Sequence, residues 1–401
     1  MKLAAGLAAI LLASAALIGG TVYARRVERG SIHALAAPDF DQKDRGRALL
    51  AEAFRQADLL PLYGSSELVV RQYEGPYHAS DFFAAYPTGF TVFPVGRPGM
   101  ASLIILQALA SVGPDLRDKK VVISLSPTWF FFPGATDRRH YAGNFSHLHA
   151  DRLVFSGDLS FDLKQQAARR LLQFPDTLEG DVLLRFALER LADGSPVNRA
   201  IYYAMLPLGE MENLVGTLQD HWATLADSQR QADARPPARR DGRAPDWSGL
   251  LAQIDREAGR RADNNPFGFS NEIWDVNGGK LAAQRNSHTD AEFIRSLQGA
   301  VEWTDFDLLL RGLVELGARP LVLSMPIDGA FYDYTGVSAQ ARAVYYQGLR
   351  EATGRYGVPL LDFADHDNDK YFLIDPWSHL SRKGWIYFDR ALDAFYHDAL
   401  P

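Results

Sequence analysis

Five short apolar runs, separated by segments with helical spacing, constrain the fold of this 401-residue chain more than any other feature. Their hydrophobicity is nearly continuous, which is typical of strands covered on both faces. Intervening segments such as Gly99–Val112 and Ala339–Tyr356 repeat apolar residues every three or four positions. This alternation predicts an α/β fold with a doubly wound, five-stranded parallel sheet, whose ligand site lies at the carboxyl ends of the strands. The predicted strands are the run from Leu59 to Gly64, Gly89–Pro94, Lys120–Leu125, Arg319–Met325 and Val358–Phe363.

The interval from about residue 133 to residue 286 breaks this alternation. It reads as mostly helical, most clearly in 160–174 and 181–194. Ser228–Asp246 combines prolines with mixed charge, which predicts a solvated linker or loop. We therefore expect one α/β domain over residues 45–401 that carries a helical insertion at about 133–286.

The N-terminus carries no charged residue from Leu3 to Ala24. A helix of that length covers roughly 33 Å, enough to cross the apolar core of a bilayer. The segment is either a membrane anchor (residues 1–26), which we favour, or an export signal cleaved after the small residues at 22–24. Three arginines follow it, so the positive-inside rule by itself would place the domain in the cytoplasm, and the charges alone do not settle the orientation.

Composition removes several classes of function. The chain has no cysteine, which excludes disulfide scaffolds, thiolate zinc sites and cysteine nucleophiles, so any nucleophile is an oxygen or a nitrogen. A net charge of −7 without a clustered basic face gives no support to nucleic-acid binding.

The stretch Gly64-Ser65-Ser66 ends the first predicted strand. Glycine permits a tight turn there, and the next serine can present its hydroxyl above the sheet while its backbone N–H points into the same space. That would supply a nucleophile and half of an oxyanion hole. The alternative is a helix N-cap, a position that serine favours.

A nucleophilic serine needs a base, and the base needs an orienting carboxylate. Asp375 precedes His379 by four residues, directly ahead of a last helix with an apolar stripe. The alternative is that Asp375 caps a short turn with Pro376 at its first position, and that His379 is a surface residue. The stripe consists of Trp385, Phe388, Leu392 and Phe395.

The chain order Ser, Asp, His, with the last two in one loop, resembles that of SGNH hydrolases. In that family the serine follows the first strand and an Asp-x-x-His motif precedes the last helix. Here three residues separate Asp375 from His379, so the loop must differ in shape, or another acid such as Asp369 must serve. The asparagine of the family's oxyanion hole is missing, and Ser126 and Thr128 stand in its place.

Three motifs narrow the resemblance to the DltD family, the D-alanyl-lipoteichoic acid biosynthesis proteins, over most of the chain. They are Gly64 to Leu68, Ser126 to Phe130, and His379-Leu380 followed by Lys383-Gly384-Trp385. The resemblance implies an SGNH-hydrolase-like three-layer sandwich on a single-pass transmembrane helix in the cytoplasmic membrane, facing the extracytoplasmic side.

The resemblance also implies an activity and partners. The activity is acyl (D-alanyl) ester transfer to an envelope polymer such as teichoic acid, with Ser66 as nucleophile, His379 as general base and Asp375 as its orienting acid. The implied partners are a multipass membrane-bound O-acyltransferase and an acyl (D-alanyl) carrier protein. Two alternatives stay open: an extracytoplasmic esterase that removes acyl groups from a polysaccharide or lipid, and a non-catalytic envelope binding protein.

Further residues complete the predicted site. Ser65 stands where many SGNH enzymes have aspartate. Gly99 or Gly96, in the loop after the second strand, offers a backbone amide as a second oxyanion donor, unless the loop is a simple βα turn. Trp129 and the phenylalanines at 130–132 could line an acyl groove, although such runs are more often core.

We expect no cofactor and no metal. His147 and His149, with His140 nearby, form a pattern that is common by chance. The acids of Asp362–Lys370 surround His366, which is typical of a solvated loop more often than of a cation site.

Overall fold

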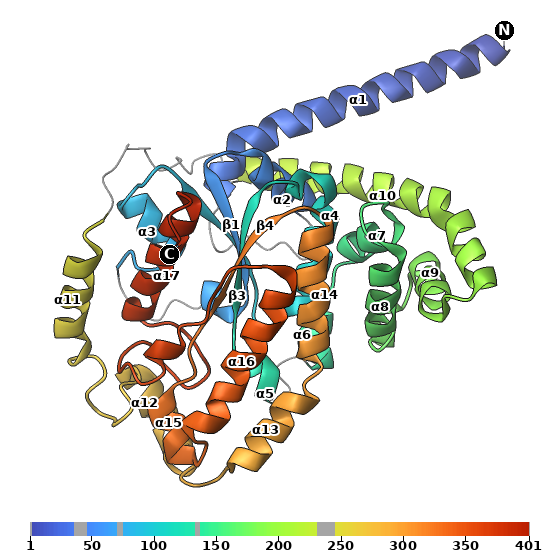
Figure 1. Ribbon diagram of the computed structural model, residues 1–401. Helices are drawn as coiled ribbons and strands as arrows, with labels where there is room; N and C mark the ends of the chain where they lie inside the picture. Colours follow the sequence, from blue (N-terminus) through green and yellow to red (C-terminus); the bar gives the residue numbers. More distant parts are fainter. Residues whose placement is uncertain (1, 36–45, 70–74, 133–136, 231–244, 401) are drawn as a thin grey trace.

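Five parallel strands form the centre of the molecule in the order β2-β1-β3-β4-β5 (Figure 1). A computed structural model describes residues 2–35, 46–69, 75–132, 137–230 and 245–400. All five predicted strands are confirmed, but the last is shorter than expected. Phe363 has a φ of 48°, a left-handed conformation that turns the chain away soon after Leu361. The strands are β1 Leu59–Gly64, β2 Thr91–Gly96, β3 Lys120–Leu125, β4 Arg319–Ser324 and β5 Leu360–Leu361.

Helices cover both faces of this sheet, which explains why its strands are apolar along their whole length. Side chains alternate between the two faces: Tyr63 and Ile123 point into one core, whereas Leu62 and Val122 point into the other. The first core is shared with α2 Arg47–Arg55, α4 Ser102–Val112, α14 Glu302–Glu315 and α16 Ala339–Tyr356, and the second with α3 Ala79–Ala85 and α17 Arg382–Tyr396. The predicted stripe of the last helix is buried in this second core.

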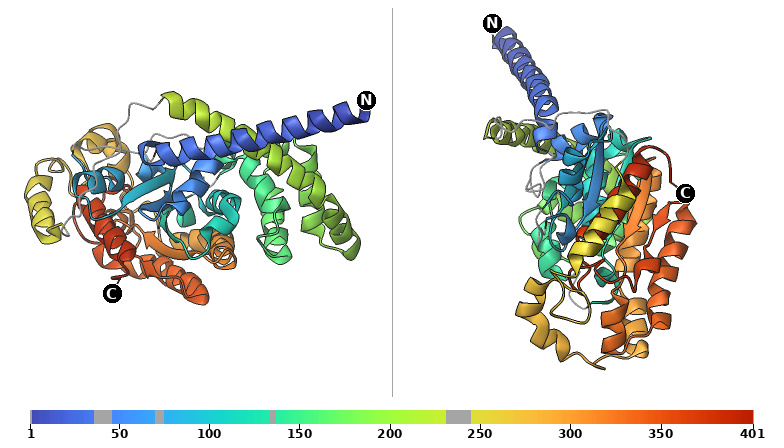
Figure 2. Two further views of the ribbon diagram at one scale, coloured as in Figure 1. Left: turned by 90° about the horizontal axis from the view of Figure 1, so that it is seen from above. Right: turned by 90° about the vertical axis from the view of Figure 1, so that its left-hand side faces the viewer.

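The chain between β3 and β4 is helical, as expected for the insertion. Side chains of Ser160, Asp181 and Thr289 accept the free amides at the starts of their helices, which fixes where α8, α9 and α13 begin. α7, α8 and α9 pack together beneath the long α10 to form a lobe beside the sheet (Figures 1 and 2). Most of the predicted linker, residues 231–244, lies outside the described residues. The helices are α5 Thr128–Phe131, α6 Arg138–Asn144, α7 His147–Phe155, α8 Phe161–Leu171, α9 Val182–Asp193, α10 Pro196–Arg230, α11 Trp247–Ala258, α12 Asn271–Ala282 and α13 Asp290–Gly299.

The first helix, α1 Lys2–Leu35, is fastened to the domain by its second half. Glu28 Oε1 lies 2.5 Å from His221 Nδ1 on α10, and His33 Nε2 lies 2.9 Å from Asp58 Oδ2 just before β1. Much of the predicted anchor lies outside the described side chains, which exclude residues 1–10, 13 and 14. Within the part of the chain that the structure describes, no helix combines the length and the apolarity needed to cross a membrane.

Candidate active site

The predicted nucleophile and base meet at the carboxyl edge of the sheet. β1 ends at Gly64, and the chain turns at once into a single 3-10 turn, Ser66–Leu68. Ser66 Oγ lies 2.9 Å from Nε2 of His379, although the two residues are 313 positions apart in the chain. The site therefore joins the first strand to the loop that precedes α17.

Asp375 completes the arrangement from within the same loop as His379. Its Oδ2 lies 2.6 Å from His379 Nδ1, and its Oδ1 accepts the backbone amides of Trp377 (2.9 Å) and His379 (3.3 Å). Ser378 has a φ of 69°, so a left-handed residue absorbs the extra position between acid and base. The carboxylate of Asp375 thus organises the turn, as the alternative interpretation expected, and also contacts the imidazole, whereas His379 is not the surface residue of that alternative.

The alternative acid, Asp369, is engaged elsewhere. It contacts His366 Nδ1 at 2.9 Å and Lys383 Nζ at 2.7 Å. His366 contacts one of its oxygens and Lys383 of α17 contacts the other, and Asp375 is the carboxylate that contacts His379.

The electrostatics of the loop favour a charged imidazole. Burial by itself lowers the pKa of His379, but the hydrogen bond and the charge of Asp375 outweigh it, with a smaller contribution from Glu67, so the pKa lies above its ordinary value. Because the Asp375 carboxylate accepts at Nδ1, that nitrogen carries the proton in the neutral ring. Nε2 is then left to accept a proton from Ser66.

Glu67 is a site residue that the sequence analysis missed. It is 2 % exposed, its Oε1 accepts the backbone N–H of Ser65 at 2.9 Å, and burial raises its pKa. A Cβ at Gly64 would lie 2.2 Å from that same Oε1, so the glycine makes room for the buried carboxylate. The sequence offered one signal for a buried acid at this position, because Glu67 directly follows the serine and directly precedes an apolar run.

The predicted oxyanion residues form the wall beside Ser66. The amide of Gly99, a glycine with a φ of 77°, donates to Ser65 Oγ at 3.0 Å, so in this state it is engaged by Ser65. Gly96 pairs with Gly64 across β1 and β2, and a Cβ there would lie 2.9 Å from the Ser65 carbonyl oxygen. The glycines therefore permit close approach of the two strand ends, and their role as oxyanion donors stays a prediction.

The aromatic run after β3 lies mainly in the core. Trp129, Phe130 and Phe131 are buried, and Phe132 is 52 % exposed. Ser126 Oγ and Thr128 Oγ1, which occupy the place of the expected asparagine, lie 2.7 Å from each other. A substrate contact of Trp129 remains a prediction.

The two histidines of the His147-x-His149 pattern lie in different environments. Nδ1 of His147 lies 3.3 Å from Asp181, and burial beside Arg47 lowers the pKa of His149 to about 4. The group best suited to a cation among the described residues is acidic instead. Asp151, Asp181 and Glu212 bring carboxylate oxygens within 4.8 Å of one another in the helical lobe.

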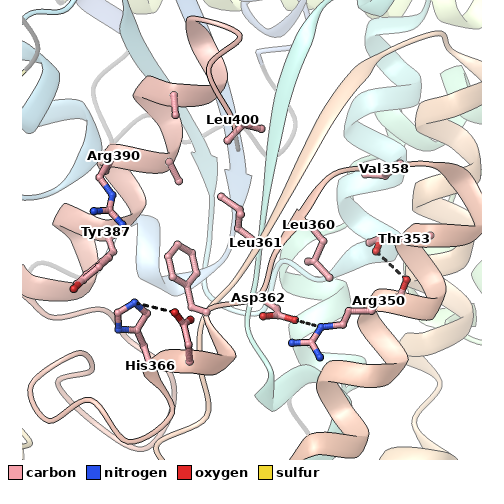
Figure 3. Close-up of a pocket in the computed structure, with 15 residues that line it drawn as sticks. Arg350, Thr353, Val358, Leu360, Leu361, Asp362, His366, Tyr387, Arg390 and Leu400 are labelled. Carbon is pink, nitrogen blue, oxygen red and sulfur yellow. Dashed lines mark hydrogen bonds and ion pairs between the residues drawn. The ribbon is translucent and has the colours of Figure 1, made fainter.

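A pocket of about 680 Å³ opens beside β5, between α16 and α17 (Figure 3). Ser66 and His379 do not line it. The acids that follow β5 are paired with bases: Asp362 accepts from Arg350 at 2.7 Å, and Asp367 accepts from Arg342 at 2.9 Å. Ion pairs thus account for these acids, in agreement with a loop and not a cation site.

The fold and the site together define an α/β protein with a serine, a histidine and an aspartate in hydrogen-bonding sequence at the carboxyl edge of a parallel sheet. The family model described as "DltD protein" matches residues 40–397, and the chain belongs to this family. Protein DltD of Bacillus subtilis (strain 168) is 29% identical over 359 residues, which cover 88% of this chain and 86% of that protein. Protein DltD of Staphylococcus aureus (strain NCTC 8325 / PS 47) is 24% identical over 352 residues, which cover 88% of this chain and 84% of that protein. Protein DltD of Lacticaseibacillus rhamnosus is also 24% identical, over 359 residues that cover 88% of this chain and 80% of that protein.

Proposed function

We propose that this protein takes part in the D-alanylation of a teichoic acid, as a serine acyltransferase of SGNH type anchored to the outer face of the cytoplasmic membrane. The observation that carries the proposal is the continuous contact from Ser66 Oγ through the His379 ring to Asp375. Membership of the DltD family supports the pathway. The proposed partners are a multipass membrane-bound O-acyltransferase and a D-alanyl carrier protein.

The geometry supports a two-step acyl transfer. In the first step Ser66 Oγ attacks the carbonyl carbon of an activated D-alanyl group, and its proton passes to His379 Nε2. The charged imidazole is stabilised by Asp375, and it returns the proton to the leaving group. In the second step a hydroxyl of the acceptor polymer attacks the acyl-serine while His379 takes its proton, and the imidazolium then gives this proton to Ser66 Oγ as the acyl–oxygen bond breaks, which regenerates the free serine.

Stabilisation of the tetrahedral intermediate needs hydrogen-bond donors close to Ser66. One well-placed donor lowers the barrier by about 3–4 kcal/mol. The amide of Gly99 would serve if Ser65 rotates its hydroxyl away from it, since the two now contact each other. Ser65 would then act as the group that holds this amide in place between turnovers.

The test is chemical labelling and product analysis of the full chain in membranes. The wild-type protein should react with a fluorophosphonate probe at Ser66 and form a D-alanyl adduct of the expected mass. Ser66→Ala should lose both, whereas Ser287→Ala, an exposed serine on the helical insertion, should lose neither. Equal labelling and equal polymer D-alanylation with Ser66→Ala would refute the enzyme and favour a binding protein.

The same experiment separates transfer from hydrolysis. The His379 side chain is 18% exposed, so water is a competitor for the acyl-serine. Transfer predicts that the D-alanyl group appears on added polymer, and that polymer speeds its loss from the enzyme. Free D-alanine as the only product, at a rate that ignores the polymer, would identify an esterase.

A further inference from the structure

α10 turns an apolar face away from the protein. Its other face, which includes Tyr202, Asn213 and Asp220, is buried. The outward residues recur every three, four or seven positions and therefore form one stripe over four turns. An exposed apolar stripe of this size on a folded protein marks a site of contact with a membrane or with another molecule. The stripe consists of Leu208 (58% exposed), Met211 (64%), Leu214 (60%), Val215 (49%) and Trp222 (64%).

α1 extends this surface. Leu17, Ile18 and Val22 of α1 are between 51% and 65% exposed. Where the two helices meet, a hollow of about 150 Å³ is lined almost entirely by apolar side chains of both, including Leu17, Leu218 and Trp222. We refer to the stripe of α10 together with these residues of α1 as the α1/α10 face.

A sharp change of polarity on α1 lies at the level of Trp222. His221, which precedes Trp222 in α10, forms the buried contact with Glu28 of α1. From Glu28 to its C-terminal end, α1 makes polar contacts with the domain. α1 carries no charged residue from Leu3 to Ala24. Tyr23 is 59% exposed at this boundary. Exposed tryptophan and tyrosine at a boundary between apolar and charged surface are typical of the interface of a bilayer.

The arrangement of the helices agrees with this boundary. α7, α8 and α9 lie on one side of α10, and α1 departs on the other side (Figure 1). The outward stripe carries no lysine or arginine, and the exposed charge nearest to it on α10 is the carboxylate of Glu210. Burial of apolar area would therefore have to drive the contact of the stripe itself, whereas the exposed Arg25, Arg26 and Arg29 of α1, just beyond the boundary, would add attraction to anionic headgroups.

We infer that the α1/α10 face rests on the lipid bilayer, with α10 lying in the interface and its apolar stripe at the boundary of headgroups and acyl chains. The inference rests on the membrane anchoring proposed above and is independent of the chemistry at Ser66. It assigns α10 a role that its sequence position inside the insertion does not suggest. The helical lobe would then fix the height and the tilt of the catalytic domain on the membrane.

The absence of cysteine makes a direct test simple, because each introduced thiol is unique. Leu208→Cys and Val215→Cys place an environment-sensitive dye on the stripe, and Val276→Cys, on α12 and 79% exposed, is the matched control. The full chain is reconstituted in phosphatidylcholine vesicles, with and without lipids that carry a nitroxide on the acyl chain. A third position on the stripe, Met211→Cys, replaces either stripe variant if its thermal unfolding differs from that of the wild type.

Contact with lipid predicts that dyes at 208 and 215 are quenched by the lipid-borne nitroxide at least about twofold more than the dye at 276, and are shielded from aqueous iodide. The same result is expected in a Ser66→Ala background, so failure of the catalytic proposal would leave this pattern intact. Equal iodide access at all three positions would overturn the inference. Shielding from iodide without quenching by lipid would also overturn it, because a protein would then cover the stripe.

Discussion

Two groups of buried ionisable residues in this molecule have raised pKa values for opposite reasons. At the carboxyl edge of the sheet, Asp375 stabilises the charged form of His379 and so raises the pKa of the imidazole. In the helical lobe, burial and the like charges of Asp181 and Glu212 destabilise the charged form of Asp151 and raise its pKa to about 8. Oxygens of Asp151 and Glu212 there have no hydrogen-bond partner. A perturbed pKa does not by itself mark a site of chemistry; in the first group the perturbed imidazole also contacts a hydroxyl, Ser66 Oγ, with which it can exchange a proton.

The largest difference between the two groups should appear on replacing one histidine in each. His379→Gln removes the proton acceptor for Ser66, and we expect acyl transfer to fall by about 10⁴–10⁶-fold. His147→Gln removes the partner of Asp181 in the helical lobe and should change the rate only slightly. The measurement is D-alanyl transfer under single-turnover conditions. A comparable loss of acyl transfer in His379→Gln and His147→Gln would show that the two groups of residues do not differ in their importance for catalysis.

Asp375→Asn should have the next largest effect. It removes the carboxylate that orients His379 and raises its pKa, so we expect a loss of about 10²–10⁴-fold. Activity needs the neutral imidazole, so in the wild type it rises with pH through the raised pKa of His379. In the variant the midpoint of this rise should move to lower pH. The test is the pH profile of kcat/KM, and an unchanged midpoint would argue against Asp375 as the source of the shift.

Gly64→Ala tests how tightly the carboxyl edge is packed. The added methyl would lie 2.2 Å from Glu67 Oε1 and 3.0 Å from Leu68 Cδ1. We expect a loss of about 1–3 kcal/mol in the free energy of unfolding, because the buried carboxylate must move. Gly143→Ala on α6 is the control, since a Cβ there meets nothing within 4 Å. Equal stability of the two variants would show that the Glu67 side chain is free to shift.

Asp151→Asn should give the smallest effect, and it is a gain. The folded-state pKa of about 8 lies above the ordinary value of 3.8, so the contribution of this carboxyl to stability is complete below pH 4 and is lost as pH rises through 8. The variant lacks this loss, so it should be more stable than the wild type at pH 9, with no gain at pH 4. Thermal unfolding at several pH values measures this, with the exposed Asp176→Asn as control. Lower stability of Asp151→Asn at every pH, reproduced in the wild type by a chelator, would instead mean that the acids hold a cation.

The strand pattern and the bounds of some elements could be predicted well from the sequence. β3 and α16 begin and end at the predicted residues, because their apolar periodicity is strong and their termini carry clear signals. The 313 positions between Ser66 and His379 were also no obstacle to predicting the two residues, since each lies in a recognisable turn. Asp375 was harder to assign, because the left-handed conformation of Ser378 that brings its carboxylate to the ring leaves no mark on the sequence.

Other features depend on neighbours that are remote in the chain. Glu67 reads as an ordinary acid after a serine, and only the folded strand ends bury it against the Ser65 amide. The apolar stripe of α10 reads as core by its spacing, yet α7 and α9 occupy the opposite face of the helix. Periodicity shows that a helix has two faces, but which face is covered is decided by the packing.

The sequence by itself determined the alternation of strands and helices, and with it a parallel sheet whose carboxyl edge collects the serine and the histidine. Local patterns suffice for this because strands buried on both faces need continuous apolar runs. The tertiary structure alone decided which acid meets His379, that a second carboxylate lies under the serine, and that α10 keeps an apolar face outside. These features depend on the backbone conformation of two short turns and on which helices pack against α10, and both are fixed only when the chain has packed.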